Sequence, residues 1–433
     1  MTKPQSQSVD RRERVLLVGV SRKKNARTGS NSTANHDFLD ELRELAESAG
    51  AAVAGTILQL RDSLDPATLV GRGKLEEIGA EANLRGVNLI IVDHDLTPVQ
   101  LRNMEKGIGC AVIDRTQLIL DIFATHAHTR EGQLQVELAQ LNYLLPRLAG
   151  GSDDLSRLGG GIGTRGPGEQ KLETDRRRIR DRVAKIRKAI ENVRRQRANR
   201  RRARQGVPLG MIAFVGYTNA GKSTLFNALT GSKVLTSNRM FATLDPTIRA
   251  IQLPSRRRVL LSDTVGFIRD LPPGLITAFR ATLEEVQEAA LIVHVTDISN
   301  PHHAEHDGQV RKVLEDLGVA NQPRLNVLNK IDRLGEEDLT ALTEAAGRGS
   351  AKILTSALTG SGLPDLLTAI DRALEIDPLV RLKLRMPASD GRNLSLVEAR
   401  GRVLRSEFAD GHFLVEAELP QSAARRLQQF ALD

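Results

Sequence analysis

Short apolar runs alternate with amphipathic stretches over the first 130 residues. The runs RVLLVGV (14–20), 51–60, VNLIIVD (87–93) and CAVID (110–114) are typical of buried strands. Amphipathic patterns over Asp37–Ser48 and Lys74–Asn83, and a third after Thr97, predict helices between them. This alternation predicts an N-terminal α/β domain with a mostly parallel sheet over residues 1–130.

Two matched apolar stripes follow, over residues 131–208. Each stripe steps by four and three residues along the chain: Leu134, Leu138, Leu141, Leu145 and Leu148, then Ile179, Val183, Ile186, Ile190 and Val193. This spacing is that of helices packed against each other. The stripes are joined by GGGIGTRGPG (159–168), which holds six glycines. We predict an antiparallel helical hairpin with a glycine-rich loop at its end, and a hinge at 205–208.

The remaining pattern divides in two. Residues 209–376 alternate strand and helix signals, which predicts an α/β domain with a mixed, mostly parallel sheet. Residues 377–433 show strand, helix, strand, strand, helix, with a turn at Asp410-Gly411, and predict a small α+β domain. The predicted fold class is therefore α/β multidomain.

A phosphate-binding loop stands at the start of the third block. GYTNAGKS (216–223) lies between a strand run and a helix run, which is the context that the P-loop pattern requires. Its backbone N–H groups and the helix N-terminus would wrap the β- and γ-phosphates. Lys222 would neutralise them, and the Ser223 hydroxyl would bind Mg²⁺.

The sequence VLNKID (327–332) indicates which base is bound. Asn329, Lys330 and Asp332 form an N-K-x-D pattern, in which the Asp332 carboxylate accepts from both the ring N–H and the amine of guanine. Adenine presents acceptor atoms to this carboxylate and would be repelled. The segment Ser356, Ala357 and Leu358 would complete the base pocket through its backbone amides.

Two further segments supply the γ-phosphate and magnesium contacts. In LLSDTVGF (260–267), Asp263 at a strand end would hold Mg²⁺ through water, and the Gly266 N–H would meet the γ-phosphate. FATLDPT (241–247) is the expected place of a switch threonine that binds Mg²⁺ only when γ-phosphate is present. We favour Thr243 over Thr247 there, and expect Lys222, Thr243 and Gly266 to act in catalysis. The complete set of predicted GTP-binding residues is Gly216, Tyr217, Thr218, Asn219, Ala220, Gly221, Lys222, Ser223, Phe241, Ala242, Thr243, Leu244, Asp245, Asp263, Thr264, Val265, Gly266, Asn329, Lys330, Ile331, Asp332, Ser356, Ala357 and Leu358.

The distribution of positive charge along the chain predicts a second binding partner besides the nucleotide. The 433-residue chain has a net charge of +9, yet residues 171–204 alone hold 16 basic and 4 acidic side chains, a surplus of 12. This concentration favours a polyanion, with nucleic acid first, over a merely solvated helix face. Aromatic residues make up 3% of the chain, so base stacking is not the expected mode of contact.

The cysteine content and the apolar runs of the sequence indicate where in the cell the protein is expected. Cys110 is the only cysteine, which excludes an internal disulfide. The N-terminus is polar, and the sequence contains no run of 18 apolar residues. We expect a cytoplasmic protein, a monomer when free, with no membrane partner.

Together these motifs resemble a known family. The third block is similar to TRAFAC-class GTPases. The stretch GGGIGTRGPGEQKLETDRRRI, the block LVGRGK (69–74) and FATLDPT resemble the HflX family of ribosome-associated GTPases, over residues 10–375. The resemblance implies binding to the large ribosomal subunit and the splitting of stalled ribosomes, notably under heat stress. It places the loop 159–168 toward the peptidyl-transferase region.

The resemblance also implies contacts and a hydrolytic mode. The arginines expected to meet ribosomal RNA phosphates are Arg157, Arg165, Arg176, Arg177, Arg178, Arg180 and Arg182. Phe267 stands where Ras-like proteins carry the glutamine that positions water, so hydrolysis should be slow alone and stimulated by the ribosome. Asn219 matches a position that holds K⁺ in some related GTPases, or else it caps the loop; Mg²⁺ and K⁺ are the cofactors considered.

Three other functions stay open. The first is a GTPase in rRNA maturation or tRNA modification, which sedimentation with mature large subunits would distinguish. The second is an RNA-remodelling ATPase working through the N-terminal domain, although residues 1–130 hold no second P-loop. The third is a binding module with vestigial nucleotide chemistry, which the four intact nucleotide motifs disfavour.

Overall fold

The computed structural model describes residues 13–22, 34–148, 167–204, 210–232, 240–241, 246–255, 257–269, 280–347, 352–375, 379–387, 390–409, 411–420, 423–424 and 427–432. Their strands form three sheets. The chain divides into two compact units, residues 1–188 with two short later segments, and the remainder. The predicted hinge at 205–208 lies outside the described residues. None of the described helices combines the length and apolar character that a membrane span requires.

The first sheet is parallel, with the order β2-β1-β3-β4. Its strands are β1 Arg14–Arg22, β2 Ala52–Arg61, β3 Leu89–Val92 and β4 Ala111–Asp114. The helices between them are α2 Ala34–Ser48, α3 Arg72–Arg85 and α4 Pro98–Ile108. The predicted α/β alternation is confirmed. The helix expected after Thr97 begins at Pro98, where Thr97 and Gln100 form a capping box.

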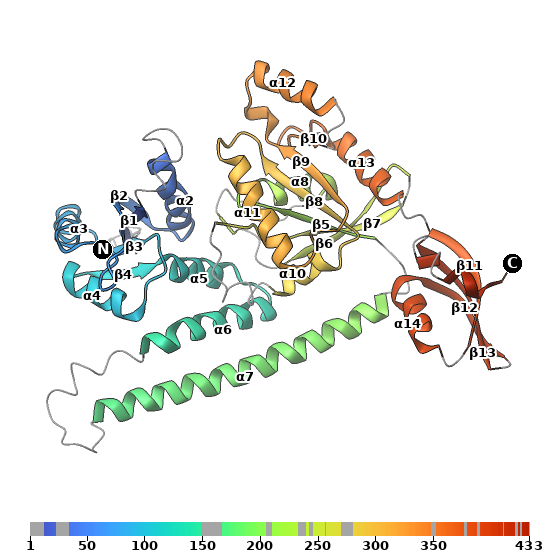
Figure 1. The fold of residues 1–433 in the computed structure, drawn as a ribbon, viewed down its shortest axis with the longest axis horizontal. Helices are drawn as coiled ribbons and strands as arrows, with labels where there is room; N and C mark the ends of the chain where they lie inside the picture. Colours follow the sequence, from blue (N-terminus) through green and yellow to red (C-terminus); the bar gives the residue numbers. More distant parts are fainter. Residues whose placement is uncertain are drawn as a thin grey trace, which may run out of the picture. The chain divides into compact units, whose positions relative to one another are not determined.

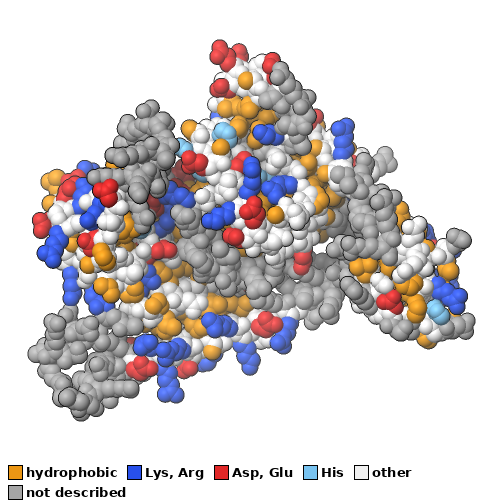
Figure 2. All heavy atoms as spheres, viewed as in Figure 1, with side chains coloured by type: hydrophobic (Ala, Val, Ile, Leu, Met, Phe, Trp, Pro, Cys, Tyr) orange, Lys and Arg blue, Asp and Glu red, His pale blue; other side chains and the backbone are white. Residues whose placement is uncertain are grey.

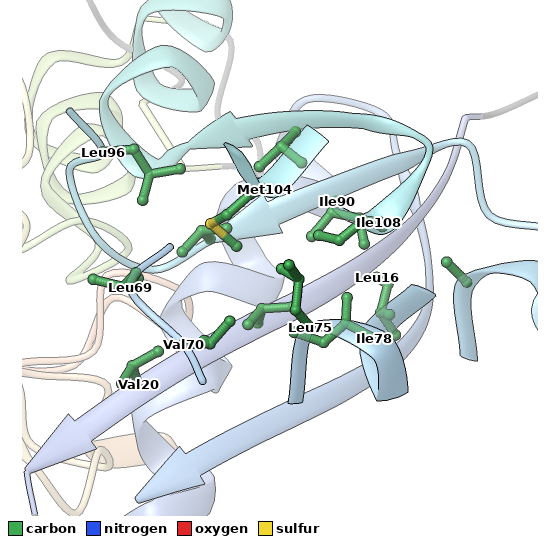
Figure 3. Close-up of a cluster of buried hydrophobic side chains, with 14 of the residues drawn as sticks. Leu16, Val20, Leu69, Val70, Leu75, Ile78, Ile90, Leu96, Met104 and Ile108 are labelled. Carbon is green, nitrogen blue, oxygen red and sulfur yellow. The ribbon is translucent and has the colours of Figure 1, made fainter. Parts of the chain in front are cut away.

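Strand and helix side chains share one core in this unit (Figure 3). Leu16 on β1, Ile90 on β3, Ile78 on α3 and Met104 on α4 are all fully buried. Because alternate strand residues face the same side, β1 and β3 each present an apolar row to α3 and α4. Burial of such side chains contributes roughly 1.5–3 kcal/mol each.

A helix that the sequence analysis missed follows β4 at once. It is α5, Arg115–His126, and Asp114 caps it by accepting a hydrogen bond from the Gln117 N–H at 2.8 Å. Asp114 is both the last residue of β4 and the N-cap of α5, so no glycine or proline loop in the sequence separates the strand from the helix. Arg115 is buried between Glu41 and Asp93, at 2.8 and 2.7 Å. Burial disfavours its charge, but the attraction of both carboxylates more than offsets this and raises the pKa of Arg115.

The helical hairpin consists of α6 Arg130–Arg147 and α7 Pro167–Arg204, which lie side by side (Figure 1). The predicted stripe of α7 is buried at Val183, Ile186 and Ile190. On α6 the predicted leucines are at most half-buried, and the buried face carries Val136 and Ala139 instead. This stripe was misplaced because α6 packs against α5. Helix α7 meets α6 through the Arg182–Glu137 ion pair.

The second sheet has the order β10-β9-β8-β5-β7-β6, and only β6 is antiparallel to its neighbour. Its strands are β5 Met211–Gly216, β6 Thr247–Gln252, β7 Arg258–Asp263, β8 Leu291–Asp297, β9 Arg324–Asn329 and β10 Lys352–Leu354. The accompanying helices are α8 Lys222–Thr230, α10 Arg280–Gln287, α11 His303–Asp316, α12 Glu336–Gly347 and α13 Leu363–Glu375, with the 3₁₀ turn η3 Ile331–Arg333. The predicted mixed, mostly parallel sheet is confirmed.

The third sheet is antiparallel, with the order β12-β13-β11-β14. Its strands are β11 Leu379–Pro387, β12 Arg402–Ala409, β13 His412–Pro420 and β14 Ala431–Leu432. Helix α14 Gly391–Arg400 packs on it through Val397, against Leu384 and Ala417. The predicted last helix falls partly on residues outside the described ones. The 3₁₀ turn η4 Gln428–Phe430 and β14 come after it, and the sequence analysis missed this strand.

Candidate nucleotide site

Four parallel strands of the second sheet end at one edge, and each ends on a residue of chemical interest. These residues are Gly216 on β5, Asp263 on β7, Asp297 on β8 and Asn329 on β9. In open α/β sheets, ligands bind in the crevice beyond the carboxyl ends of the strands. The sheet order therefore brings the predicted P-loop, the D-x-x-G segment and the N-K-x-D segment together.

The P-loop fits this edge because of its glycines. A Cβ on Gly216 would lie 2.2 Å from the Val295 carbonyl oxygen on β8, so only glycine fits between the two strands. Gly221 has φ +90°, a left-handed conformation that favours glycine, and precedes the first turn of α8. The loop thus places the N-terminus of α8, with its unbonded N–H groups, at the strand edge.

Lys222 is buried at the base of this loop. Its Nζ donates to the carbonyl oxygens of Gly216 and Tyr217, at 3.1 and 2.7 Å. Burial lowers the pKa of Lys222 to about 8, Asp263 opposes this shift, and Lys330 adds to it. The ammonium is therefore short of negative charge, which phosphate oxygens would supply.

Ser223 and Asp263 form the oxygen pair of the site. The Ser223 hydroxyl donates to Asp263 Oδ2 at 2.6 Å, and the Asp263 side chain is fully buried. A hydroxyl and a carboxylate are hard oxygen ligands of the kind that Mg²⁺ prefers. The residues present therefore fit a magnesium ion.

The D-x-x-G segment is attached directly to the P-loop. The Phe267 N–H donates to the Gly216 carbonyl at 3.1 Å, and the Thr218 N–H donates to the Phe267 carbonyl at 2.7 Å. Gly266 lies so close that a Cβ there would be 2.8 Å from Thr218 Cα and 3.0 Å from Lys222 Nζ. Phe267 itself is 1% exposed. Its ring is therefore part of the buried core.

Tyr217 makes a further contact between the P-loop and the segment that follows Phe267. Its hydroxyl accepts a hydrogen bond from the Arg269 N–H at 2.7 Å. Its ring stacks on His306 of α11, with ring centroids 3.8 Å apart and the planes 3° from parallel. The sequence analysis listed Tyr217 among the predicted GTP-binding residues and missed this stack, because stacking on α11 leaves no local signal.

The N-K-x-D segment meets the P-loop through Asn329. Its Nδ2 donates to the Ala220 carbonyl at 2.9 Å, and its Oδ1 accepts from the Ala357 N–H at 3.0 Å. One side chain thus holds the P-loop, β9 and the segment 356–358 in place.

Asp332 and Lys330 complete this corner. The Ser356 hydroxyl donates to Asp332, and Lys330 Nζ lies 2.6 Å from Asp297 Oδ2. Asp297 was missed by the sequence analysis, although a carboxylate at the end of the buried run LIVHVT is a usable signal. Ile331 lies in η3, and Leu358 is 80% exposed at the rim. The structure thus brings Asn329, Lys330, Asp332, Ser356 and Ala357 together.

The switch segment is described only in part. Ala242, Thr243, Leu244 and Asp245 lie outside the described residues, so their predicted roles stay predictions. Phe241 belongs to the first compact unit, where its ring meets that of Phe123 on α5 edge-on, with centroids 4.6 Å apart. The neighbouring Met240 N–H donates to Ser48 Oγ at 2.8 Å. Thr264 and Val265 are buried beside Asp263.

Comparison with known proteins decides the family. Three family models match in order: GTP-binding GTPase N-terminal over residues 36–124, GTP-binding GTPase Middle Region over 126–204, and 50S ribosome-binding GTPase over 211–330. A GTPase HflX of Caldanaerobacter subterraneus subsp. tengcongensis is 44% identical, covering 97% of this chain and 94% of that protein. The chain belongs to the HflX family of GTPases.

Other HflX relatives are similar over nearly as much of the chain. The GTPase HflX of Magnetococcus marinus is 46% identical over 90% of each chain, and that of Escherichia coli strain K12 is 43% identical over 82% of this chain and 83% of its own. This HflX-family chain is therefore a GTP hydrolase, which binds GTP and releases GDP and phosphate.

Lys222 should leave a signature in the pH dependence of stability. Its pKa is about 8 in the folded protein, against an ordinary 10.5, so between these values the unfolded chain binds more protons. The free energy of unfolding then rises with pH across this window, and below it the lysine is protonated in both states. We expect Lys222→Met to remove this rise in nucleotide-free protein, as measured by urea unfolding at pH 8 and pH 10. Lys312→Met, at an exposed position of α11, is the control, and an unchanged rise in Lys222→Met would contradict the assignment.

Asp332 should determine base specificity. Xanthine carries a carbonyl where guanine carries its amine, so Asp332→Asn would exchange an accepting oxygen for a donating amide. We expect GTP affinity to fall by about tenfold or more and XTP affinity to rise, because each mismatch leaves polar groups unpaired. Competition binding against a fluorescent nucleotide measures both constants. Asp338→Asn on α12 is the control, and an unaltered preference for GTP over XTP in Asp332→Asn would be incompatible with this role.

Proposed function

We propose that this GTPase is a nucleotide-gated switch on the large ribosomal subunit, and that it splits or rescues stalled ribosomes under stress. The match of residues 211–330 to the model described as 50S ribosome-binding GTPase supports the partner. The rescue activity rests on the resemblance of the glycine-rich loop and its arginines to the HflX signature.

The basic surface of α7 is the observation that carries the proposal. Lys and Arg side chains line the outer face of this helix in Figure 2, with fewer acidic ones between them. Arg177, Arg178, Arg180 and Arg182 are exposed, while Arg176 is half-buried. Arg157 and Arg165 lie outside the described residues. A long basic rod suits the phosphate backbone of RNA, which is recognised by charge and shape rather than by base identity.

The ion pairs on this rod leave its arginines available. Arg182 forms a bidentate pair with Glu137 at 2.7 and 2.9 Å, whereas Arg178–Asp175 and Arg180–Glu173 are longer, at 3.4 and 3.8 Å. Exposed pairs contribute about 0–1 kcal/mol, so RNA phosphates can replace the carboxylates at little cost.

The hydrolytic cycle follows from the site. Ser223 and Asp263 would hold Mg²⁺, which neutralises phosphate charge when bound, and Thr243 would join the ion's ligands in the GTP state. Lys222 and the Gly266 N–H would contact the γ-phosphate. Because Phe267 is buried and cannot orient water, turnover by the free protein is slow, and the ribosome accelerates it.

We expect GTP turnover to rise strongly on adding purified large subunits, and the stimulation to fall as salt increases, because phosphate contacts release counterions. Steady-state phosphate release across a KCl series measures both effects. Arg177→Gln with Arg178→Gln should weaken stimulation and flatten its salt dependence, leaving turnover by the free protein unchanged. Arg372→Gln, an exposed arginine on α13, is the matched control. Equal turnover with and without subunits at low salt would overturn the proposal.

We also propose that K⁺ serves at Asn219, which is exposed and has φ +60° in the P-loop. A cation there would supply the positive charge that an arginine finger supplies in other GTPases. We expect turnover to be several times faster in KCl than in NaCl at equal ionic strength, and Asn219→Ala to abolish the difference. Equal rates in the two salts would rule this role out and leave Asn219 as a loop cap.

A further inference from the structure

Thr218 is the P-loop residue whose side chain the interactions above do not use. It is 6% exposed, and its Oγ1 has no hydrogen-bond partner among the described residues. A buried hydroxyl without a partner costs about 1–3 kcal/mol. Two other buried hydroxyls of this domain have partners: Thr264 donates to the Phe214 carbonyl, and Thr296 donates to Asp307 at 2.6 Å. Among the described residues of this domain, the Ser262 hydroxyl also lacks a partner, but Ser262 lies within strand β7, whereas Thr218 lies in the P-loop itself.

The side chain of Thr218 lies beside Gly266 and Lys222. A Cβ on Gly266 would lie 2.9 Å from Thr218 Cγ2 and 3.0 Å from Lys222 Nζ. The methyl of Thr218 thus faces the glycine whose N–H is expected to meet the γ-phosphate, and the ammonium of Lys222 approaches the same point. The hydroxyl is carried by the same Cβ as that methyl.

The backbone fixes this side chain firmly. The Thr218 N–H is held by the Phe267 carbonyl, and the neighbouring Tyr217 is held by Arg269 and His306. A β-branched side chain on such a backbone has few rotamers. Its hydroxyl is therefore preorganised, which is the property that a group acting on a transition state needs.

We propose that the Thr218 hydroxyl orients the attacking water in GTP hydrolysis, in the place that the buried Phe267 ring cannot fill. The hydroxyl accepts a hydrogen bond from the water and donates one to a γ-phosphate oxygen. The water oxygen bonds to the γ-phosphorus, and the bond from phosphorus to the β–γ bridging oxygen breaks. GDP leaves with that electron pair, and the proton lost by the water ends on a γ-phosphate oxygen. Thr218 itself is neither ionised nor consumed.

Two substitutions separate the hydroxyl from the shape of the side chain. Thr218→Val keeps the volume, the β-branch and the backbone bond to Phe267, and removes only the hydroxyl. Thr218→Ser keeps the hydroxyl. Thr368→Val is the matched control, since Thr368 is a half-buried residue of α13 whose hydroxyl donates to the Pro364 carbonyl of its own helix. All three are compared with the unaltered full chain in single-turnover GTP hydrolysis.

We expect Thr218→Val to lower the hydrolysis rate constant by about tenfold or more, as loss of one preorganised hydrogen bond does elsewhere. The Kd values for GDP and for a non-hydrolysable GTP analogue should stay within about twofold, and Thr218→Ser should hydrolyse nearly as fast as the unaltered chain. Three results would each overturn the proposal. They are an unchanged rate in Thr218→Val, an equal slowing in Thr218→Ser, and a loss confined to nucleotide affinity.

A binding measurement tests the same point without turnover. GDP with aluminium fluoride mimics the planar phosphoryl group with its in-line water. We expect Thr218→Val to bind this complex at least about tenfold more weakly than the unaltered chain, at equal affinity for GDP alone. Equal affinity of both proteins for the aluminium fluoride complex would also overturn the proposal.

Discussion

Two backbone hydrogen bonds between the P-loop and Phe267 determine the geometry of the nucleotide site. They join Gly216 and Thr218 to the D-x-x-G segment as a continuation of the pairing between β5 and β7. Gly266, Thr218 and Lys222 are consequently packed within a few ångströms of one another, and a Cβ at Gly266 has no room. Main-chain atoms make both hydrogen bonds. A side-chain substitution in these segments can therefore change hydrolysis without breaking the contact between the P-loop and the D-x-x-G segment.

At this edge of the sheet, burial lowers the pKa of Lys222 and the nearby Asp263 carboxylate raises it. Lys222 is buried, and its two donated bonds go to neutral carbonyls, so burial dominates and its pKa falls. Lys330, by contrast, lies beside the Asp297 carboxylate at 2.6 Å. The two lysines of the nucleotide motifs thus differ in their partners. Lys330 is paired with a carboxylate of the protein, whereas both bonds that Lys222 donates go to neutral carbonyl oxygens.

Much of this could be predicted from sequence, because the signals are local. Strand runs, the glycines of GYTNAGKS and the N-K-x-D spacing each lie within a few residues, and they predicted the two α/β sheets and the composition of the site. The misses came from contacts between distant segments. Helix α5 has no loop before it, since Asp114 ends the strand and caps the helix. The buried face of α6 depends on α5, the Tyr217 stack depends on α11, and the unsatisfied Thr218 hydroxyl shows only once its surroundings are known.

Helix α7 is continuous over 38 residues, Pro167–Arg204. At 1.5 Å per residue it is about 57 Å long, close to twice the hydrocarbon thickness of a membrane. A rod of that length acts as a lever arm. A tilt of roughly 5° at one end displaces the other by about 5 Å, comparable to one helical turn. A small change of angle at one end of this helix is therefore enough to move the other end by about the pitch of the helix itself.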